Sequence, residues 1–437
     1  MAKPKNPADT VFCRTIPRHL VKRPVLIIGW IPRIVMAIAR SLHRHGIPVD
    51  VADFVTPPLY SRAIRKRFKL PHPSTDGEVF KTELRRVIKD GGHDMLIPAD
   101  DQALAAAIRH YDDLADLVTV TCPPPDITTQ VLNKALTLET AKRCGIPVPK
   151  TVLINDSSEL HDLRNQIPFP WILKPVEKQM RAEEIKSCRL NGTDDVATRF
   201  PHSQAFTPPM LLQEYCEGVG VGVELLMYEG ECIVAFQHRR LKEFPFTGGM
   251  AVTAISEAPD AVLVKHSLSL LRALEWDGVA MVEFRVNPVD GRAALMEVNG
   301  RYWGTLSLPV MAGIDFPLYH WQLLHGEIPQ VPSYAAGLCW RWSGGYLARL
   351  NGIIAASMGS GPLRRRLWAE LAGSVHDFTF KTRDPELCFF DPLPALISLG
   401  RSMKFVASRN FSAVLRRLPA SRIIRRSIKV AGTVSGN

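Results

Sequence analysis

The chain has 437 residues, enough for roughly three domains, and its 46% hydrophobic and 22% charged residues exclude global disorder. Its net charge of +11 is a basic excess found in proteins that bind nucleic acids, anionic membranes or acidic substrates. Nine Lys and Arg and no acidic residue fall in 401–437, which leaves 45 basic and 43 acidic residues elsewhere. The excess therefore belongs to the C-terminal tail, and we expect no nucleic-acid partner, since no nucleic-acid-binding signature is present.

The N-terminal sequence has no apolar stretch of the kind found in signal peptides. No run approaches the ~18 apolar residues of a membrane-spanning helix. The eight cysteines are scattered, without the close spacing of zinc or redox sites. We therefore expect reduced cysteines and a cytoplasmic protein.

Residues 1–120 alternate between short apolar runs and segments with helical periodicity. We expect strands at 24–30, 48–52 and 94–100, and helices at 32–45, 77–90 and 101–110. Repeated βαβ units predict a small parallel α/β domain. Gly29 stands alone where a dinucleotide-binding turn needs three glycines, which argues against NAD binding.

A proline-rich linker at 122–126 precedes a larger domain, expected over 121–330. We expect helices at 128–144, 157–165 and 260–274, and strands at 151–155, 171–175, 211–218 (continuing β-rich to about 240), 279–286 and 293–299. Residues 331–437 are predicted to be an extension with helical stretches and the basic tail. The fold class is thus α/β followed by α+β.

Two glutamates provide the strongest chemical signal. Glu283 and Glu297 each lie in an apolar run, VAMVEF and ALMEVN, and each is expected on a core strand. Neighbouring carboxylates repel unless a cation lies between them. Asn299 projects from the same face as Glu297, and two carboxylates with an amide oxygen suit Mg²⁺. The alternative is that each acid is buried beside Arg285 or Arg301.

Several basic residues are candidates for binding anions. Lys174 follows three apolar residues in WILKP, so its charge requires a partner, although the alternative is a lysine that reaches solvent. Arg301 follows Asn299 closely and suits stabilisation of a transferred phosphoryl group. A second cationic group is expected on a loop that could grip a substrate carboxylate, or that could be merely solvated: His238, Arg239, Arg240 and Lys242.

The order of these motifs resembles the ATP-grasp superfamily, in particular carboxylate–amine ligases related to the large chain of carbamoyl-phosphate synthase. The resemblance covers roughly 20–330. It rests on Lys134, Lys174, QEYCEG at 213–218, HRRL at 238–241, Glu283 and EVNGRYWG at 297–304. The N-terminal domain, with SRAIRKRFKLP at 61–71 and IPADDQALA at 97–105, resembles the pre-ATP-grasp domain.

The resemblance implies a role for each matching residue. Lys134 and Lys174 would contact the phosphates of ATP, and Arg301 would stabilise the transferred phosphoryl group. The adenine hinge would be Glu214, Tyr215 and Cys216, with Glu217 or Glu224 near the ribose. Glu283, Glu297 and Asn299 would hold two Mg²⁺ ions, or Mn²⁺. A lid subdomain is implied at about 150–212.

Two departures from the family pattern stand out. The phosphate loop after Lys174 is usually rich in glycine, whereas 175–187 contains none. Lys178 or Arg181 could replace its backbone donors, or turnover could be slow. Gly300 also stands where proline is common, which would loosen the backbone but remove no ligand.

The implied function is ATP-dependent joining of a carboxylate to an amine through an acyl phosphate. The alternatives are another ATP-grasp reaction, such as carboxylation or phosphorylation, and a degenerate or regulatory nucleotide-binding module. Dimers are frequent among relatives, so a homodimer is an open expectation. The tail at 403–430 has the pattern of a basic amphipathic helix, which suits either an anionic membrane surface or docking on the body.

Overall fold

The structure is a computed structural model that describes residues 22–54, 59–74, 76–178, 187–200, 202, 205–245, 248–357, 368, 373, 382–400 and 403. The chain forms two compact units. The first unit comprises 1–239 and 256–337, and the second comprises 240–255 and 338–437. The candidate site lies within the first unit.

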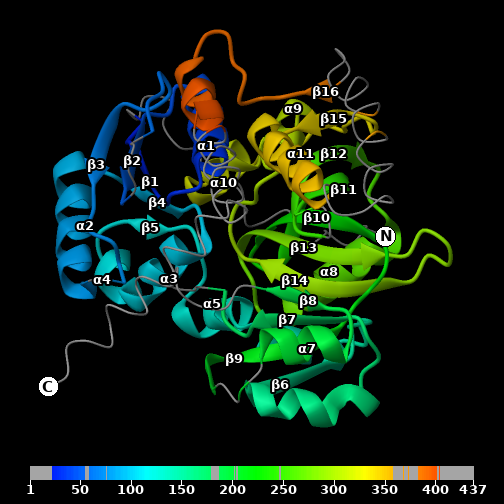
Figure 1. Ribbon diagram of the computed structural model, residues 1–437. Coiled ribbons are helices and arrows are strands. Elements are labelled where there is room, and N and C mark those ends of the chain that lie inside the picture. Colours follow the sequence, from blue (N-terminus) through cyan, green and yellow to red (C-terminus); the bar gives the residue numbers. More distant parts are fainter. Residues whose placement is uncertain are drawn as a thin grey trace, which may run out of the picture. The chain divides into compact units, whose positions relative to one another are not determined.

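The first unit begins with a parallel sheet of strand order β3-β2-β1-β4-β5. Its strands are β1 (Val25–Ile28), β2 (Val49–Asp53), β3 (Lys66–Lys69), β4 (Met95–Pro98) and β5 (Thr119–Val120). The helices are α1 (Pro32–Arg44), α2 (Gly77–Gly91), α3 (Asp101–Arg109) and α4 (Tyr111–Ala115). Figure 1 shows α1 and α2 on opposite sides of this sheet. The predicted parallel α/β architecture is confirmed, and β3 is a strand that was not predicted from the sequence.

The carboxyl ends of β1 and β4 form the point where the strand order reverses, the usual location of ligand sites in such sheets. Gly29 follows β1 with a φ of 144°, and a Cβ there would lie 2.8 Å from a carboxylate oxygen of Asp100. This close approach lets the Trp30 N–H donate to Asp100 at 2.7 Å. The same carboxyl group caps α3 through Ala103 N–H at 3.0 Å, so the start of α3 is anchored to β1.

The predicted helix over 128–144 is wrong in one respect, because two helices occupy this segment. They are α5 (Pro125–Leu132) and α6 (Lys134–Arg143). Asn133 between them is extended, and its side chain accepts the N–H groups of Ala135 and Leu136. An N-cap of this kind begins a new helix. Lys134 is therefore the first residue of α6 rather than an interior residue.

A four-stranded antiparallel sheet of order β6-β9-β7-β8 follows. Its elements are β6 (Thr151–Asp156), β7 (Trp171–Pro175), β8 (Cys188–Leu190), β9 (Ala205–Glu214), the 3₁₀ helix η2 (Ser157–Asn165) and α7 (Thr193–Arg199). The sheet buries Trp171, Leu173 and Leu212 against η2 and α7 residues. The segment predicted as an α-helix at 157–165 is thus a 3₁₀ helix, and the strand predicted at 211–218 ends at Glu214.

The third sheet supplies the remaining strands of the first unit, in the order β14-β13-β10-β11. They are β10 (Val219–Tyr228), β11 (Glu231–Phe244, whose last residues belong to the second unit), β13 (Gly278–Val286) and β14 (Ala293–Asn299). Helix α8 (Ala261–Ala273) packs on one face through Leu263, Leu270 and Leu271, against Val221 and Val223. Helices α9 (Ser307–Met311) and α10 (Phe316–Leu324) follow β14. Side chains alternate between the two faces along each strand. Those that do not point toward α8 therefore project from the opposite face.

The second unit contains strands as well as helices. Strand β12 (Met250–Glu257, reaching into the first unit) pairs with β15 (Cys339–Arg341), which pairs with β16 (Thr382–Arg383). Helix α11 spans Ser343–Ser357, and residues 393–400 are helical. The predicted extension at 331–437 is therefore not purely helical. The basic tail predicted at 403–430 lies outside the described residues from 404 onward.

No helix in the described part of the chain is long and apolar enough to cross a membrane. The seven cysteines for which the structure gives a state are free thiols. The predicted domain limits, 1–120, 121–330 and 331–437, stay predictions.

Gly300 is required by packing rather than by flexibility. A Cβ at this position would lie 2.3 Å from the ring of Trp276 and 3.0 Å from Val131. Trp276 is buried in the core under α8 and cannot move aside cheaply. The glycine therefore lets the Trp276 ring pack closely at this junction, and the expected loosening of the backbone stays a prediction.

The Gly300→Ala variant is expected to lower the free energy of unfolding by about 1–3 kcal/mol, because it overpacks this core. Urea unfolding measures the change. Gly77→Ala serves as the control, since a Cβ at Gly77 meets nothing closer than 3.9 Å. Equal stabilities of the two variants would contradict the packing argument.

Candidate active site

The two predicted metal-binding carboxylates lie on neighbouring antiparallel strands. Glu283 of β13 pairs directly with Glu297 of β14, and Met281 pairs with Asn299. Directly paired residues project from the same face of a sheet. The predicted adjacency of the two strands is confirmed, and the face is the one opposite α8.

Glu297 is surrounded by lysines. Burial raises the pKa of Glu297, but the positive charges of Lys178, Lys134 and Lys174 outweigh it and lower the pKa to about 2. Glu297 is therefore ionised throughout the physiological range. The alternative partner Arg301 contributes more weakly to this shift and makes its ion pair with Asp101 instead.

Lys134 reaches the site from the first turn of α6. Its Nζ donates to the carbonyls of Pro175 at 3.0 Å and Glu177 at 3.4 Å. Burial, reinforced by the charges of Lys178 and Lys174, lowers the pKa of Lys134 to about 8 although Glu297 acts in the opposite direction. The position of this ammonium group thus depends on the break at Asn133, because an Asn133–Glu177 bridge joins α6 to the end of β7.

Lys174 lies on β7 and is only 9% exposed. Burial lowers the pKa of Lys174, and Glu297 and Glu283 partly offset the effect. The alternative in which the Lys174 side chain reaches solvent is thereby excluded. An additional negative charge nearby would stabilise the protonated form of such an ammonium group.

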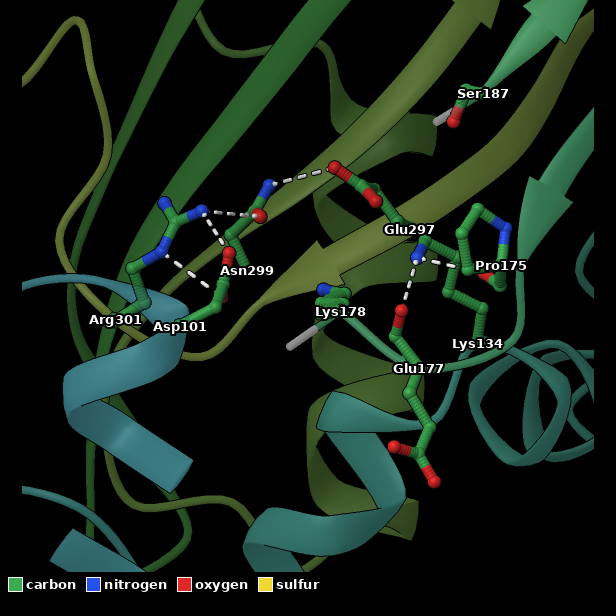
Figure 2. Close-up of a pocket in the computed structure, with 9 residues that line it drawn as sticks. All are labelled: Asp101, Lys134, Pro175, Glu177, Lys178, Ser187, Glu297, Asn299 and Arg301. Atoms are coloured by element: carbon green, nitrogen blue, oxygen red, sulfur yellow. Dashed lines mark hydrogen bonds and ion pairs between the residues drawn. The ribbon is translucent and has the colours of Figure 1, made fainter. Parts of the chain in front are cut away.

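Glu297, Lys134 and Lys178 line a cavity of about 310 Å³ (Figure 2). Its lining is Asp101, Lys134, Pro175, Glu177, Lys178, Ser187, Glu297, Asn299 and Arg301. Figure 2 shows that the Glu177 carboxylate points away from the Lys134 ammonium, which donates to the backbone carbonyl of Glu177 and not to its carboxylate. The lining therefore combines three basic side chains, those of Lys134, Lys178 and Arg301, with the carboxylates of Asp101, Glu177 and Glu297. Such a mixture suits a phosphate ligand that is accompanied by a divalent cation.

Arg301 lies at the opposite end of the cavity from Lys134 (Figure 2). It forms a two-pronged ion pair with Asp101, with Nε and Nη2 at 3.1 and 2.8 Å from the carboxylate oxygens. Nη2 also donates to Asn299 Oδ1 at 3.2 Å. Asp101 comes from the first turn of α3, so the N-terminal domain contributes directly to this cavity.

The donor set fits Mg²⁺ only in combination with a phosphate ligand. The described residues contain no cluster of three His, Cys, Asp or Glu side chains that could hold a metal ion. Glu283, Glu297 and Asn299 together offer two carboxylates and one amide oxygen on one face. Mg²⁺ is commonly bound by one or two carboxylates, phosphate oxygens and water, so the set fits that mode.

A sequence model of the family described as "ATP-grasp in the biosynthetic pathway with Ter operon" matches residues 206–343. This segment includes Glu283, Glu297, Asn299 and Arg301. No curated protein is significantly similar to the chain in sequence.

Solved structures share the architecture over most of the chain. The L-amino acid ligase of Bacillus licheniformis is 18% identical with a TM-score of 0.57, covering 70% of this chain and 77% of its own. An N5-carboxyaminoimidazole synthetase of Staphylococcus aureus complexed with ADP is 13% identical with a TM-score of 0.56, covering 71% and 79%. The biotin carboxylase domain of the 2-oxoglutarate carboxylase of Hydrogenobacter thermophilus, with MgADP, is 13% identical with a TM-score of 0.58, covering 74% of each chain.

The chain has the ATP-grasp fold. The predicted resemblance to the ATP-grasp superfamily is thereby confirmed, and so is the predicted fold class. The roles that the resemblance implies for individual residues remain predictions, which the geometry allows us to sort.

The second cationic group was predicted on a loop, but the structure places it on strand β11. His238 is fully buried, and its Nδ1 lies 2.6 Å from Glu224 Oε1. Arg239 pairs in register with Val221, on the face that packs on α8, and bonds Glu257. Arg239 is therefore on the face opposite Glu297, because neighbouring residues of a strand alternate.

Two members of this group belong to the second unit. Arg240 lies 3.3 Å from Glu243 and donates to the Gly249 carbonyl at 2.9 Å. Lys242 donates to the Tyr346 hydroxyl at 3.0 Å. Their predicted contact with a substrate carboxylate stays a prediction.

The predicted adenine hinge of the ATP-grasp fold follows β9. Glu214 ends the strand and accepts the Lys150 N–H at 2.9 Å. The Tyr215 ring lies 4.1 Å from the guanidinium carbon of Arg189. Cys216 is half-buried, and burial raises the pKa of its thiol, so this cysteine is no reactive thiolate.

The two alternatives for ribose binding differ in accessibility. Glu217 is exposed in the connection from β9 to β10. Glu224 is fully buried on β10 and bonded to His238. The structure thus favours Glu217 of the two, because Glu224 would have to leave its partner to reach a ligand.

The glycine-free loop is only partly described, and Arg181 lies outside the described residues. Lys178 is described, and its Nζ donates to the Val298 carbonyl on β14. Its ammonium group therefore lies beside Glu297, as a substitute for backbone donors would require.

Asp101 is a site residue that sequence reasoning missed. The available signal was IPADD, where two acids directly follow an apolar strand. Polar residues at the carboxyl end of a parallel strand near the reversal of strand order are candidates for binding. The motif was used only for the resemblance, and its pairing with Arg301, 200 residues away, requires the tertiary structure.

Proposed function

We propose that the chain is an ATP-dependent ligase that joins a carboxylate to an amine through an acyl phosphate. The observation that carries the proposal is the cavity lined by Glu297, Lys134 and Lys178. Glu297 pairs with Glu283 on the neighbouring strand, and the charge of Lys174 also acts on it. Cations around paired carboxylates, with Lys174 buried, suit a triphosphate with divalent cations. One of the structural relatives is an L-amino acid ligase, which supports ligation as the reaction.

Glu283, Glu297 and Asn299 would hold Mg²⁺ or Mn²⁺, which would neutralise phosphate charge. Lys134 and Lys174 would bind the phosphates of ATP, and Arg301 would stabilise the phosphoryl group during transfer. No protein nucleophile is required, since positioning and charge carry phosphoryl transfer.

The bond changes follow from this arrangement. A carboxylate oxygen attacks the γ-phosphorus, the bond from that phosphorus to the β,γ-bridging oxygen breaks, and an acyl phosphate and ADP form. The amine nitrogen attacks the acyl carbon, inorganic phosphate leaves, and the nitrogen loses a proton to give an amide. The buried cations lower the barrier of the first step by stabilising charge on the transferred group.

Two observations favour second candidates. Other structural relatives are a carboxyaminoimidazole synthetase and a carboxylase domain, which keeps carboxylation or phosphorylation open. The absence of glycine in 175–187 favours a nucleotide-binding module without turnover.

The deciding experiment measures ADP release with ATP, Mg²⁺ and pools of amino acids and other carboxylates and amines, with Glu297→Gln as the reference. We expect ADP above the reference in at least one pool, and a condensation product of the two substrates by mass spectrometry. ADP release that requires bicarbonate, with a carboxylated product, would replace ligation by carboxylation. Mg·ATP binding without ADP release in any pool would replace it by the nucleotide-binding module.

A further inference from the structure

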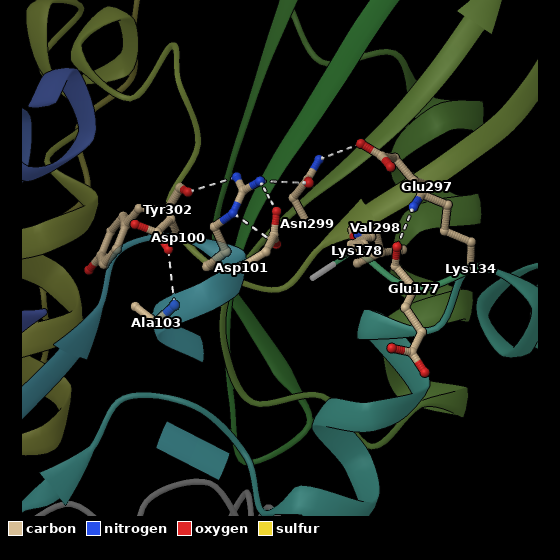
Figure 3. A network of polar contacts seen from close by, with 11 residues as sticks. Asp100, Asp101, Ala103, Lys134, Glu177, Lys178, Glu297, Val298, Asn299 and Tyr302 are labelled. Atoms are coloured by element: carbon tan, nitrogen blue, oxygen red, sulfur yellow. Dashed lines mark hydrogen bonds and ion pairs between the residues drawn. The ribbon is translucent and has the colours of Figure 1, made fainter. Parts of the chain in front are cut away.

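Arg301 links Asp101 of α3 to Asn299 of β14. Figure 3 shows Asp101 on one side of this polar network and Asn299 and Glu297 on the other. Its guanidinium donates to both oxygens of Asp101, to the Tyr302 carbonyl at 3.0 Å and to Asn299 Oδ1 at 3.2 Å. Asn299 in turn donates from Nδ2 to Glu297 Oε1 at 3.4 Å. One hydrogen-bonded chain therefore runs from Asp101 to the carboxylate of Glu297.

A guanidinium in this place competes with a divalent cation. The oxygens that would bind Mg²⁺ are the carboxylate of Glu297 and the amide oxygen of Asn299. These are also acceptors close to Arg301, which already holds Asn299 Oδ1. A carboxylate–guanidinium pair is strong when it is two-pronged, so an unrestrained Arg301 would be drawn to Glu297.

Asp101 opposes this movement from the other side. Its carboxylate forms the two-pronged pair, with Asp101 22% and Arg301 12% exposed. Asp101 itself is fixed, because Asp100 ties the start of α3 to Trp30 at the end of β1. The arginine is thus pulled toward α3 and away from β14.

Building on the function proposed above, we infer that Asp101 is a positioning residue that keeps the Arg301 guanidinium off the Glu297 carboxylate. The Asp101 carboxylate thereby leaves the Glu297 oxygens to a divalent cation. Without the Asp101 carboxylate, the Arg301 guanidinium would pair with Glu297 and occupy the place of the divalent cation. The first domain then sets the divalent-cation affinity of a site built on β13 and β14.

The test measures Mn²⁺ binding by electron paramagnetic resonance, in the presence of ADP, for the full chain and its variants. Asp101→Asn is expected to weaken Mn²⁺ binding about tenfold, as for partners that orient metal ligands. Asp101→Asn combined with Arg301→Gln is expected to bind Mn²⁺ within about twofold of Arg301→Gln alone. Asp116→Asn, at an exposed position in the same domain, is the matched control.

The outcomes separate the two proposals. An unmodified protein that binds no Mn²⁺ with ADP overturns the proposed function and this inference with it. Equal Mn²⁺ affinity of Asp101→Asn and the unmodified protein, with nucleotide binding intact, overturns this inference alone. So does a loss of affinity that persists in the double variant, since a merely structural role of Asp101 does not depend on Arg301. Thermal unfolding of each variant verifies that it folds.

If Asp101→Asn does not fold, Asp101→Glu replaces it, because this variant keeps the negative charge. The Mn²⁺ affinity of Asp101→Glu is expected to lie closer to that of the unmodified protein than to that of the charge-free double variant.

Discussion

Replacing Glu297 with Gln is expected to lower Mg²⁺-dependent ATP turnover by about 10³-fold or more, equivalent to about 4 kcal/mol of transition-state stabilisation. The carboxylate lines the cavity and pairs in register with Glu283 of the neighbouring strand. A neutral amide keeps the shape but removes the charge that attracts a divalent cation. Steady-state ADP release at saturating Mg²⁺ and ATP measures the effect.

The same substitution is expected to affect stability. The pKa of Glu297 is lowered to about 2 from 4.5, burial acting against the three lysines that cause the decrease. A lowered carboxyl pKa contributes stability above the unfolded-state pKa, and this contribution disappears as pH falls through 4.5 toward 2. At pH 7 the Glu297→Gln variant should therefore lose on the order of 3 kcal/mol, which urea unfolding measures.

Glu139→Gln is the matched control, because Glu139 is exposed on α6. This control should keep both turnover and stability. Turnover of Glu297→Gln within tenfold of the unmodified protein would contradict a role for this carboxylate in the chemistry.

Replacing Lys134 with Met is expected to have opposite effects on binding and on stability. Affinity for Mg·ATP should fall by about 100-fold, since the variant lacks the ammonium group that we propose binds the phosphates. The nucleotide-free protein should gain about 2–3 kcal/mol of stability at pH 7, because burial lowers the pKa of Lys134 from 10.5 to about 8. Isothermal titration and urea unfolding measure the two effects.

The pH dependence follows from the same shift. Because the folded-state pKa lies below the unfolded one, the cost of charged Lys134 is fully present below pH 8 and disappears between pH 8 and 10.5. The stability advantage of Lys134→Met should shrink over that range. In the unmodified protein, affinity for Mg·ATP should decrease above pH 8 by up to about tenfold per unit, and this slope should be absent in Lys134→Met.

Lys142→Met is the control on the same helix, since Lys142 is exposed in the last turn of α6. It should change neither affinity nor the pH slope. Undiminished Mg·ATP affinity in Lys134→Met would remove Lys134 from the nucleotide site.

The parts of the site that sequence reasoning placed correctly lie on strands. Glu283 and Glu297 occupy matching positions in two apolar runs, and the period of two along a strand assigns their faces. Two long apolar strands close together in sequence usually pair as neighbours. Their direct register, Glu283 opposite Glu297, is consistent with that reasoning.

The parts that sequence reasoning placed wrongly depend on partners distant in the chain. The helix break at Asn133 is stabilised by the side-chain cap and by contact with Glu177 on another element. Arg239 was assigned to a ligand loop, yet its face is set by pairing with β10. A basic run by itself does not reveal which of its members faces the cavity.

By itself, the sequence determined the α/β and α+β order of elements, the two strand acids, and the location of the basic excess at 401–437. These features are local, since they depend on periodicity and composition within short windows. The tertiary structure alone decided that Asp101 meets Arg301, that Gly300 accommodates Trp276, and that three lysines surround Glu297. Each of these is a contact between segments far apart in the chain, and distance in sequence carries no information about which buried charges become neighbours.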